Sequence, residues 1–180
     1  DPHGKDRSPG RDARDADSVV RDRGRDAGDV GPVPGIVRWT QGVKGILCAS
    51  QISSGDENNL NIRVYGETGG LEWHQNEPNT MLVKWLDKPM QVYRTANGYL
   101  GRAALAAGRT PPAHPEGYLE AFANIYRNFA LSLSAKIDGK KPSDENFDFP
   151  RVDEGIRGMA FIDNVVKSAQ SKEKWTEHIV

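Results

Sequence analysis

Alternating apolar and polar residues mark a series of short strands in the first half of the chain. In the segment 60–65, Leu60, Ile62 and Val64 occupy alternate positions, which is the period of a strand with one buried face. Five other segments have the same character: 36–39, 43–52, 71–74, 81–86 and 91–95. The connections between them are too short for a helical crossover, so the pattern predicts a mostly antiparallel open sheet of about six strands within residues 35–95.

Apolar residues recur at helical spacing in two long segments of the second half. The first helix is expected between Pro115 and Gly139, and its predicted buried stripe consists of Tyr118, Phe122, Ile125, Phe129 and Leu133. The second is expected to begin near Val152, and its predicted stripe consists of Ile156, Met159, Ile162, Val165 and Ala169. A bare sheet is unstable, so we expect both helices to pack on one of its faces, which makes the fold α+β.

The strands of the predicted sheet carry apolar residues on both faces. In the segment 81–86, Met81, Val83 and Trp85 share one face, while Leu82 and Leu86 take the other. Two helices cover one face only, so we expect a partner subunit to cover the open face in a homodimer or tetramer. The alternative is that these are the scattered apolar residues that any surface carries.

Residues 1–34 differ in composition from everything that follows. They contain no Phe, Trp, Tyr, Leu or Ile, and residues 1–30 hold eight Asp against seven Arg and Lys. Such a segment has too little apolar surface to offset the entropy of ordering, so we expect it to be disordered or non-native. Its residue types also match GC-rich DNA read out of frame, so a frameshift before Gly35 is one hypothesis and a charged interaction tail is another. The folded domain is expected to be 35–180.

Composition narrows the class of protein. A chain of 180 residues suits one domain, and a formal net charge of −1 gives no reason to expect nucleic acid or an anionic membrane as a partner. No apolar run approaches the roughly 20 residues of a membrane span, and the N-terminus lacks the apolar core of a signal peptide. We therefore expect a cytoplasmic protein. The single cysteine, Cys48, cannot form an internal disulfide.

Residues with catalytic potential are few. The four histidines are dispersed without the spacing of a metal site, and the chain has no nucleophile elbow, phosphate-binding loop or dinucleotide fingerprint. The stretch from His114 to Tyr118 stands at a loop-to-helix junction, where backbone donors can meet an anionic or hydroxylated ligand. Ordinary helix capping is the alternative interpretation of this stretch.

Several separated motifs occur in a recognisable order. In the sheet region they are Gly42-Val43-Lys44-Gly45, Ala49-Ser50-Gln51, Ile62-Arg63-Val64-Tyr65-Gly66 and Gly69-Gly70-Leu71-Glu72-Trp73. In the helical region they are His114-Pro115-Glu116-Gly117-Tyr118 and Gly155-Ile156-Arg157-Gly158-Met159-Ala160-Phe161. Together they resemble the C-terminal domain of the Gfo/Idh/MocA family, which includes glucose–fructose oxidoreductase and inositol dehydrogenase. The resemblance covers about residues 35–175.

The resemblance implies the second half of an NAD(P)-dependent sugar or cyclitol dehydrogenase, with substrate-binding and oligomerisation roles. Members of the family bind the cofactor on a preceding Rossmann domain, and their catalytic lysine lies in a Glu-Lys-Pro motif. Here the nearest match is Asp87-Lys88-Pro89, a coincidence in a hairpin, so we expect no catalytic or cofactor-binding residue in this chain and no activity of the chain alone. The expected substrate-binding residues are His114, Glu116, Tyr118 and Gln51. The alternative is a stand-alone assembly or ligand-binding module without catalysis.

Overall fold

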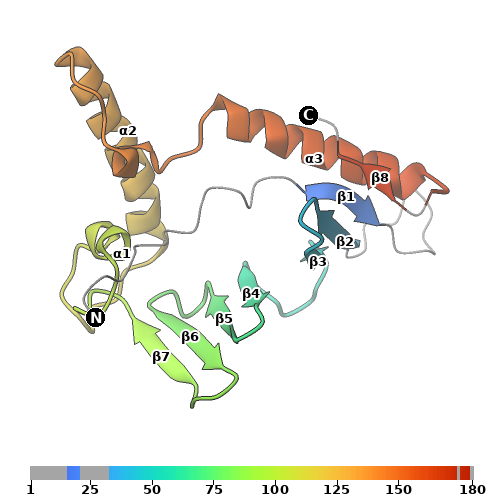
Figure 1. The fold of residues 1–180 in the computed structure, drawn as a ribbon, viewed down its shortest axis with the longest axis horizontal. Helices are drawn as coiled ribbons and strands as arrows, with labels where there is room; N and C mark the ends of the chain where they lie inside the picture. The colour runs from blue at the N-terminus through green and yellow to red at the C-terminus, as the bar shows by residue number, and fades with distance from the viewer. Residues whose placement is uncertain (1–15, 21–32, 174, 179–180) are drawn as a thin grey trace, which may run out of the picture. The chain divides into compact units, whose positions relative to one another are not determined.

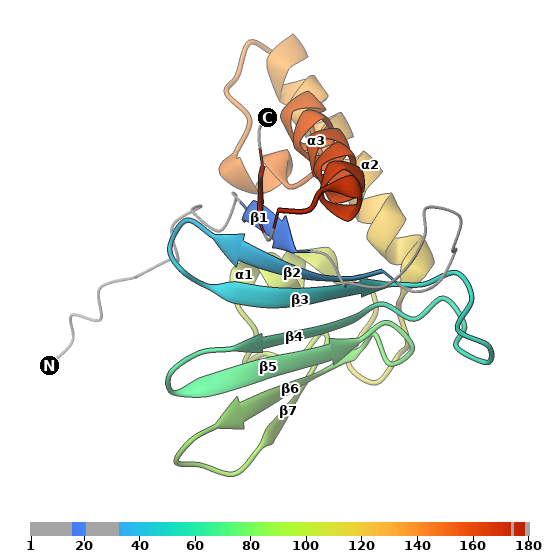
Figure 2. The same cartoon turned by 90° about the vertical axis from the view of Figure 1, so that its right-hand side faces the viewer.

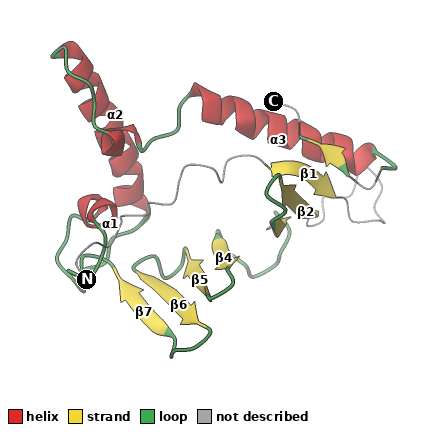
Figure 3. Cartoon of the chain, in the orientation of Figure 1, coloured by secondary structure: helices red, strands yellow, loops and turns green. Residues whose placement is uncertain are grey.

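The computed structural model describes residues 16–20, 33–173 and 175–178 of the chain (Figures 1 and 3). The chain divides into two compact units, the first made of residues 1–55 and 151–180 and the second of residues 56–150. Each unit contains one antiparallel sheet of four strands and one long helix. The α+β class predicted from the sequence is confirmed.

The sheet of the first unit has the strand order β3-β2-β1-β8. Its strands are β1 (Ala16–Val20), β2 (Val33–Trp39), β3 (Lys44–Ala49) and β8 (Thr176–Glu177). The β2–β3 hairpin is visible in Figure 2, and its turn contains Gly42 at a φ of +84°, a conformation that favours glycine. The helix α3 (Val152–Gln170) contacts β1 and β8, so residues from both ends of the chain form this unit.

The sheet of the second unit is a meander of four strands in sequence order. They are β4 (Asn61–Tyr65), β5 (Gly69–His74), β6 (Thr80–Trp85) and β7 (Gln91–Arg94). Three helical elements follow: α1 (Arg102–Ala107), α2 (Tyr118–Ile137) and the 3-10 turn η1 (Asp144–Phe147). The turn η1 packs against α2, where the Ser132 hydroxyl donates a hydrogen bond to the carbonyl of Asn146 at 2.6 Å.

The register of β4–β7 assigns the residues of this sheet to two faces. In one row Ile62, Trp73, Met81 and Tyr93 lie side by side across the four strands. These four residues and the apolar residues two or four positions away on the same strands share one side of the sheet. This apolar face consists of Ile62, Val64, Leu71, Trp73, Met81, Val83, Trp85 and Tyr93. The period-2 assignment made from the sequence is therefore confirmed for this face.

The opposite face of the same sheet carries a cluster of charges around Glu72. Its carboxylate accepts hydrogen bonds from Lys84 and from His74 Nε2 (2.7 Å), and Arg63 Nε lies 3.5 Å away. The hydrogen bonds from Lys84 and His74, with the charge of Arg63, lower the pKa of Glu72 to about 2. The carboxylate therefore links three adjacent strands in its ionised form.

The structure differs from the sequence-based expectation in how the strands are grouped. The pattern predicted one sheet of about six strands, whereas β2 and β3 join the sheet of the first unit and β4–β7 form another. Within the segment 1–34, Ala16–Val20 forms β1 and Val33 begins β2. Residues 1–15 and 21–32 lie outside the described residues, and the frameshift remains a prediction.

The predicted burial of the helical stripes is wrong. The five stripe residues of α2 are 37–64% exposed, and Ile156, Met159 and Ile162 of α3 are exposed as well. The buried positions of these helices are polar instead: Ser132 on α2, and Asn164 and Ser168 on α3. The partners of the helices are small elements, since α2 packs on η1 and α3 packs on β1 and β8, and these cover little of each stripe.

Gly69 pairs with Trp85 of β6 and leaves little space for a side chain, and this close contact can be tested. A Cβ at this position would lie 2.5 Å from the carbonyl oxygen of Lys84. We expect Gly69→Ala to lower the free energy of unfolding by about 2 kcal/mol, because the strands must separate to admit the methyl group. Gly98→Ala is the matched control, since its Cβ would meet nothing within 4 Å. Urea unfolding followed by tryptophan fluorescence measures both, and equal stabilities would contradict the close contact.

The cluster around Glu72 predicts a pH dependence of stability. The folded-state pKa of Glu72, about 2, lies below the ordinary value, so the ionised carboxylate stabilises the fold at neutral pH and this contribution is lost as the pH falls from about 5 towards 2. We expect Glu72→Gln to flatten the fall in melting temperature over this range. Glu67→Gln, at an exposed position in the β4–β5 turn, is the control and should keep the wild-type slope. Parallel curves for all three proteins would show that the cluster contributes nothing.

Candidate functional site

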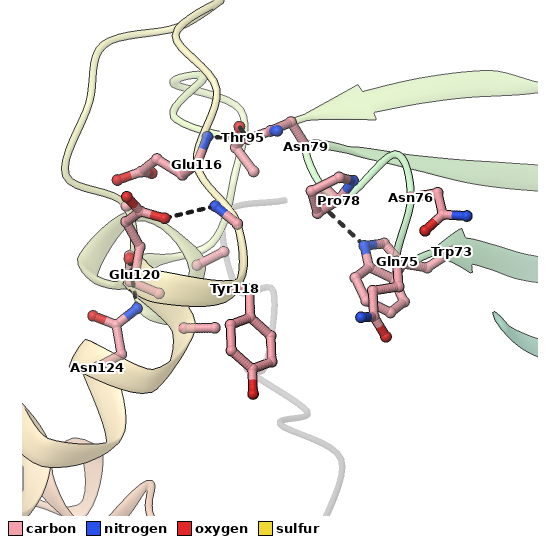
Figure 4. A pocket seen from close by; sticks show the side chains of 15 residues that line it. Trp73, Gln75, Asn76, Pro78, Asn79, Thr95, Glu116, Tyr118, Glu120 and Asn124 are labelled. Carbon is pink, nitrogen blue, oxygen red and sulfur yellow. Dashed lines mark hydrogen bonds between the residues drawn. The ribbon is translucent and has the colours of Figure 1, made fainter. Parts of the chain in front are cut away.

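The second unit contains a cavity of about 440 Å³, which we call the Trp73–Tyr118 cavity (Figure 4). Its walls come from the β5–β6 turn, the end of β7, the helix α1 and the first turns of α2. The lining residues are Trp73, Gln75, Asn76, Pro78, Asn79, Thr95, Ala104, Ala107, Gly108, Glu116, Gly117, Tyr118, Glu120, Ala121 and Asn124. The volume falls within the range of small-molecule sites, which is about 300–1,000 Å³.

The sheet side of the cavity is formed by a tight turn between β5 and β6. Trp73 ends the apolar face, and its indole Nε1–H donates a hydrogen bond to the carbonyl of Pro78 at 3.1 Å. The turn itself is closed by main-chain bonds from Glu77 to His74 and from Thr80 to Glu77, each 3.1 Å long. The indole is thereby held in one orientation, half-buried at the cavity wall.

Asn79 connects this turn to the helical side of the cavity. Its Oδ1 accepts the main-chain N–H of Glu116 at 3.0 Å and the hydroxyl of Thr95 at 3.3 Å. Its main-chain carbonyl also accepts the N–H of Thr95 at 3.1 Å. One residue therefore joins the start of β6, the end of β7 and the loop before α2.

Glu116 accepts hydrogen bonds from the main chain of the loop before α2 and so holds its two ends together. Its carboxylate Oε1 accepts the main-chain N–H groups of Arg109 at 2.7 Å and of Thr110 at 3.2 Å. A further bond runs from the Thr110 hydroxyl to the carbonyl of His114 at 3.2 Å. The side chain of Glu116 is half-buried and acts as the internal acceptor of a loop that would otherwise leave these donors to solvent.

The first turns of α2 supply the other side of the cavity. The carboxylate of Glu120 accepts the N–H of Gly117 at 2.8 Å, and this bond lowers the pKa of Glu120. Asn124 Nδ2 donates to the carbonyl of Ala107 at 2.8 Å and so fastens the end of α1 to α2. Tyr118 lies on the α2 side of the cavity, opposite the turn that carries Pro78 (Figure 4). Its ring is 64% exposed.

The wall of the cavity combines apolar and polar residues. Aromatic residues, alanines and glycines make up seven of the fifteen lining residues, and four of the seven residues with polar side chains other than the aromatic ones are neutral amides. Among the described residues no group of His, Cys, Asp or Glu could hold a metal ion. In the described part of the chain, no helix has an apolar stretch sufficient to cross a membrane.

The structure brings together two of the four predicted site residues. Glu116 and Tyr118 line the cavity, whereas His114 is exposed outside its lining, with Nδ1 at 3.2 Å from the carbonyl of Pro112. Gln51 is exposed and belongs to the first unit. The binding roles of all four residues remain predictions.

Sequence reasoning missed the residues of the sheet side. Trp73 was interpreted as part of a strand and of a family motif, and Asn79 was not considered. Their one sequence signal is an aromatic residue at a strand end followed by the turn residues Asn76, Pro78 and Asn79, which predicts a turn but no ligand.

Comparison with known proteins gives a consistent family. The model of the oxidoreductase family C-terminal alpha/beta domain, Gfo/Idh/MocA, matches residues 16–177. An uncharacterized oxidoreductase of Bacillus subtilis, YfiI, is 31% identical over 142 residues, which cover 79% of this chain and 36% of that protein.

Two solved structures share the fold and are more than 25% identical to this chain in sequence. An oxidoreductase from Sinorhizobium meliloti is 34% identical with a TM-score of 0.77, over 90% of this chain and 46% of that one. An inositol dehydrogenase homolog from Azotobacter vinelandii, solved with NADH and myo-inositol, is 26% identical with a TM-score of 0.77, over 89% of this chain and 43% of that one.

The chain spans less than half the length of each of these proteins. The matched family model covers nearly all of the chain, including β1 and β8, which hold opposite ends of the described sequence in one sheet. The resemblance found in the sequence motifs is therefore confirmed. The chain belongs to the Gfo/Idh/MocA oxidoreductase family and corresponds to its C-terminal alpha/beta domain.

Proposed function

We propose that this chain is the substrate-binding and oligomerisation half of an NAD(P)-dependent dehydrogenase acting on a sugar or cyclitol, and that the Trp73–Tyr118 cavity receives the substrate. The observation that carries the proposal is the wall of this cavity, where two aromatic rings meet a set of neutral amides. Aromatic rings stack on the C–H face of a sugar ring, and amides both donate to and accept from its hydroxyl groups.

The family supports the class of substrate. The homolog from Azotobacter vinelandii was solved with NADH and myo-inositol, a ring that bears only hydroxyl groups. In our proposal this chain contributes binding and orientation, since holding a hydroxylated ring in one position lowers the entropic part of the barrier. Tyr118 and Glu116 are its proposed site residues. His114 lies outside the cavity lining and Gln51 lies in the first unit. The binding roles of these two residues remain predictions from the sequence.

The start of α2 does not suit the pyrophosphate of a dinucleotide. A pyrophosphate needs free main-chain N–H groups at a helix N-terminus that follows a glycine turn. At the start of α2 the N–H of Gly117 already donates to Glu120, and the carboxylate of Glu116 stands beside the same turn. Two carboxylates would repel a phosphate. Our proposal therefore places cofactor binding away from this cavity, and the choice between NAD and NADP stays open.

The apolar face of β4–β7 supports the proposed oligomerisation. Ile62 and Val64 on β4 are 48% and 55% exposed, and Leu71 and Trp85 on the neighbouring strands are exposed as well. A second, apolar hollow of about 280 Å³ lies on this face above Gly69 and Gly70. Contiguous apolar surface of this kind marks an interface, and a symmetric dimer would bury it twice.

The substrate proposal is tested in an enzyme that joins this chain to a cofactor-binding domain. We expect Tyr118→Ala to lower kcat/KM for the polyol by about tenfold, because one ring contact of roughly 1.4 kcal/mol is lost. Tyr126→Ala is the matched control, since Tyr126 lies on the same helix, is 70% exposed and does not line the cavity. His114→Ala measured in parallel decides the role of His114.

Three results would distinguish the alternatives. Equal kinetics of the Tyr118 and Tyr126 variants would remove the cavity from the substrate site. A loss of kcat/KM in His114→Ala alone would indicate that the substrate binds on the side of the loop where His114 is exposed. If the joined enzyme oxidised no polyol with either nicotinamide cofactor, a stand-alone binding or assembly module would be the better description.

The oligomerisation proposal is tested with the chain itself. We expect sedimentation of residues 1–180 at micromolar concentration to give a dimer or tetramer, and Ile62→Lys to shift it to the monomer because a charge is buried twice in a symmetric interface. Asn61→Lys, on the same strand but the opposite face, is the control and should leave the assembly intact. A folded wild-type monomer without concentration dependence would contradict the proposal.

A further inference from the structure

The charged residues that line the Trp73–Tyr118 cavity are both acidic. Among its lining residues, Glu116 and Glu120 carry charge at neutral pH, and no Lys, Arg or His takes part in the lining. The guanidinium of Arg109 donates to the main-chain carbonyl of Glu120 at 3.1 Å from outside the lining, and its positive charge acts on Glu120. The charges that line the cavity itself are therefore those of two carboxylates.

Both carboxylates are held at the cavity by the fold. Glu116 accepts two main-chain N–H groups of the loop before α2, and Glu120 accepts the N–H of Gly117. The N–H of Gly117 lowers the pKa of Glu120, so this carboxylate keeps its negative charge at neutral pH. Neither side chain can swing away without leaving main-chain donors unpaired.

The remaining polar groups of the cavity are neutral and available to a ligand. Within the described residues, Asn79 Nδ2, Asn124 Oδ1 and the hydroxyl of Tyr118 have no hydrogen-bond partner. The side-chain amide of Asn76 and Nε2 of Gln75 are likewise without a partner in the described chain. These groups lie on both sides of the cavity, on the β5–β6 turn and on α2 (Figure 4).

We propose that this cavity selects an uncharged polyhydroxylated ring and rejects phosphorylated or carboxylated sugars, with Glu116 and Glu120 as the residues that determine this specificity. The inference rests on the proposed function in taking the ligand to be a polyol. Neutral amides and aromatic faces bind a ring of hydroxyl groups without regard to charge. A phosphate or carboxylate would add a like charge beside two fixed carboxylates, and such repulsion discriminates between ligands as strongly as attraction does.

The test is direct binding of two matched probes to the 180-residue chain. We expect titration calorimetry to give a dissociation constant for myo-inositol at least tenfold lower than that for myo-inositol 1-phosphate, a ratio that roughly one repulsive contact in a partly exposed site can produce. The indole N–H resonance of Trp73 should shift on addition of myo-inositol. The double variant E116Q/E120Q should narrow the ratio to about twofold, because glutamine keeps an oxygen that accepts the same main-chain N–H groups but removes the charge.

The control is E57Q/E67Q, which removes two exposed carboxylates outside the cavity and should leave the wild-type ratio unchanged. The ratio of the two dissociation constants in the wild-type chain tests the inference even if E116Q/E120Q does not fold. Equal or tighter binding of the phosphate would overturn the inference, and so would the absence of any binding, binding of myo-inositol that leaves Trp73 unmoved, or an unchanged ratio in a folded E116Q/E120Q.

These results are independent of the test of function. Oxidation of a polyol by the joined enzyme together with equal binding of both probes would refute the specificity proposed here and leave the function standing. Selective binding of myo-inositol at Trp73 without oxidation by the joined enzyme would do the reverse.

Discussion

The candidate site depends on the side chain of Asn79. Its carboxamide oxygen joins the β5–β6 turn to the loop before α2 through the N–H of Glu116, a residue 37 positions away, and to β7 through the hydroxyl of Thr95. No strong packing between α2 and the strands of this unit supplements the connection, since the main described partner of α2 is η1. The cavity exists because one amide fixes the distance between a turn of the sheet and the start of a helix.

The second constraint is the amount of apolar surface that this chain leaves uncovered. Among the described residues, Val37 and Val83 are the buried hydrophobic side chains, while the stripe of α2 is exposed and four residues of the apolar face of β4–β7 are exposed as well: Ile62, Val64, Leu71 and Trp85. Sequences with correct amphipathic periods and unburied apolar faces are typical of parts of a larger assembly. The chain also spans less than half of its solved relatives. The uncovered apolar surface is what the proposed oligomerisation would bury.

The secondary structure was predictable because it follows from the spacing of apolar residues and from the residue types that favour turns. The strands near 60–65 and 81–86 and both long helices appear where the pattern indicated, with α2 two residues after the predicted start and α3 at Val152. The short helix α1 was missed because its alanine-rich sequence has no amphipathic stripe. The grouping into two sheets was not predictable either, because strand partners are chosen by long-range register, which alternation alone does not encode.

The site was predictable to the level of one loop. The stretch from His114 to Tyr118 lies at the junction where the candidate cavity is found, but spacing could not say which of its side chains would line it. The residues that complete the cavity, Trp73 and Asn79, come from a turn far upstream and reach the loop through bonds between a side chain and the main chain. Such bonds do not recur at a regular spacing along the chain, so no pattern in the sequence predicts them.

Helix capping was one of the two alternatives posed for that stretch, and the side chains that cap α2 and close the loop also line the cavity. Glu120 caps α2 and Glu116 closes the preceding loop, and both carboxylates line the cavity. A residue that satisfies main-chain donors cannot be exchanged for a cation without losing those bonds, so the fold itself limits the charges that this cavity can present. Relatives that bind anionic sugars with the same loop would need another acceptor for the N–H groups of Arg109, Thr110 and Gly117. Ligand charge and loop structure are therefore coupled through Glu116 and Glu120.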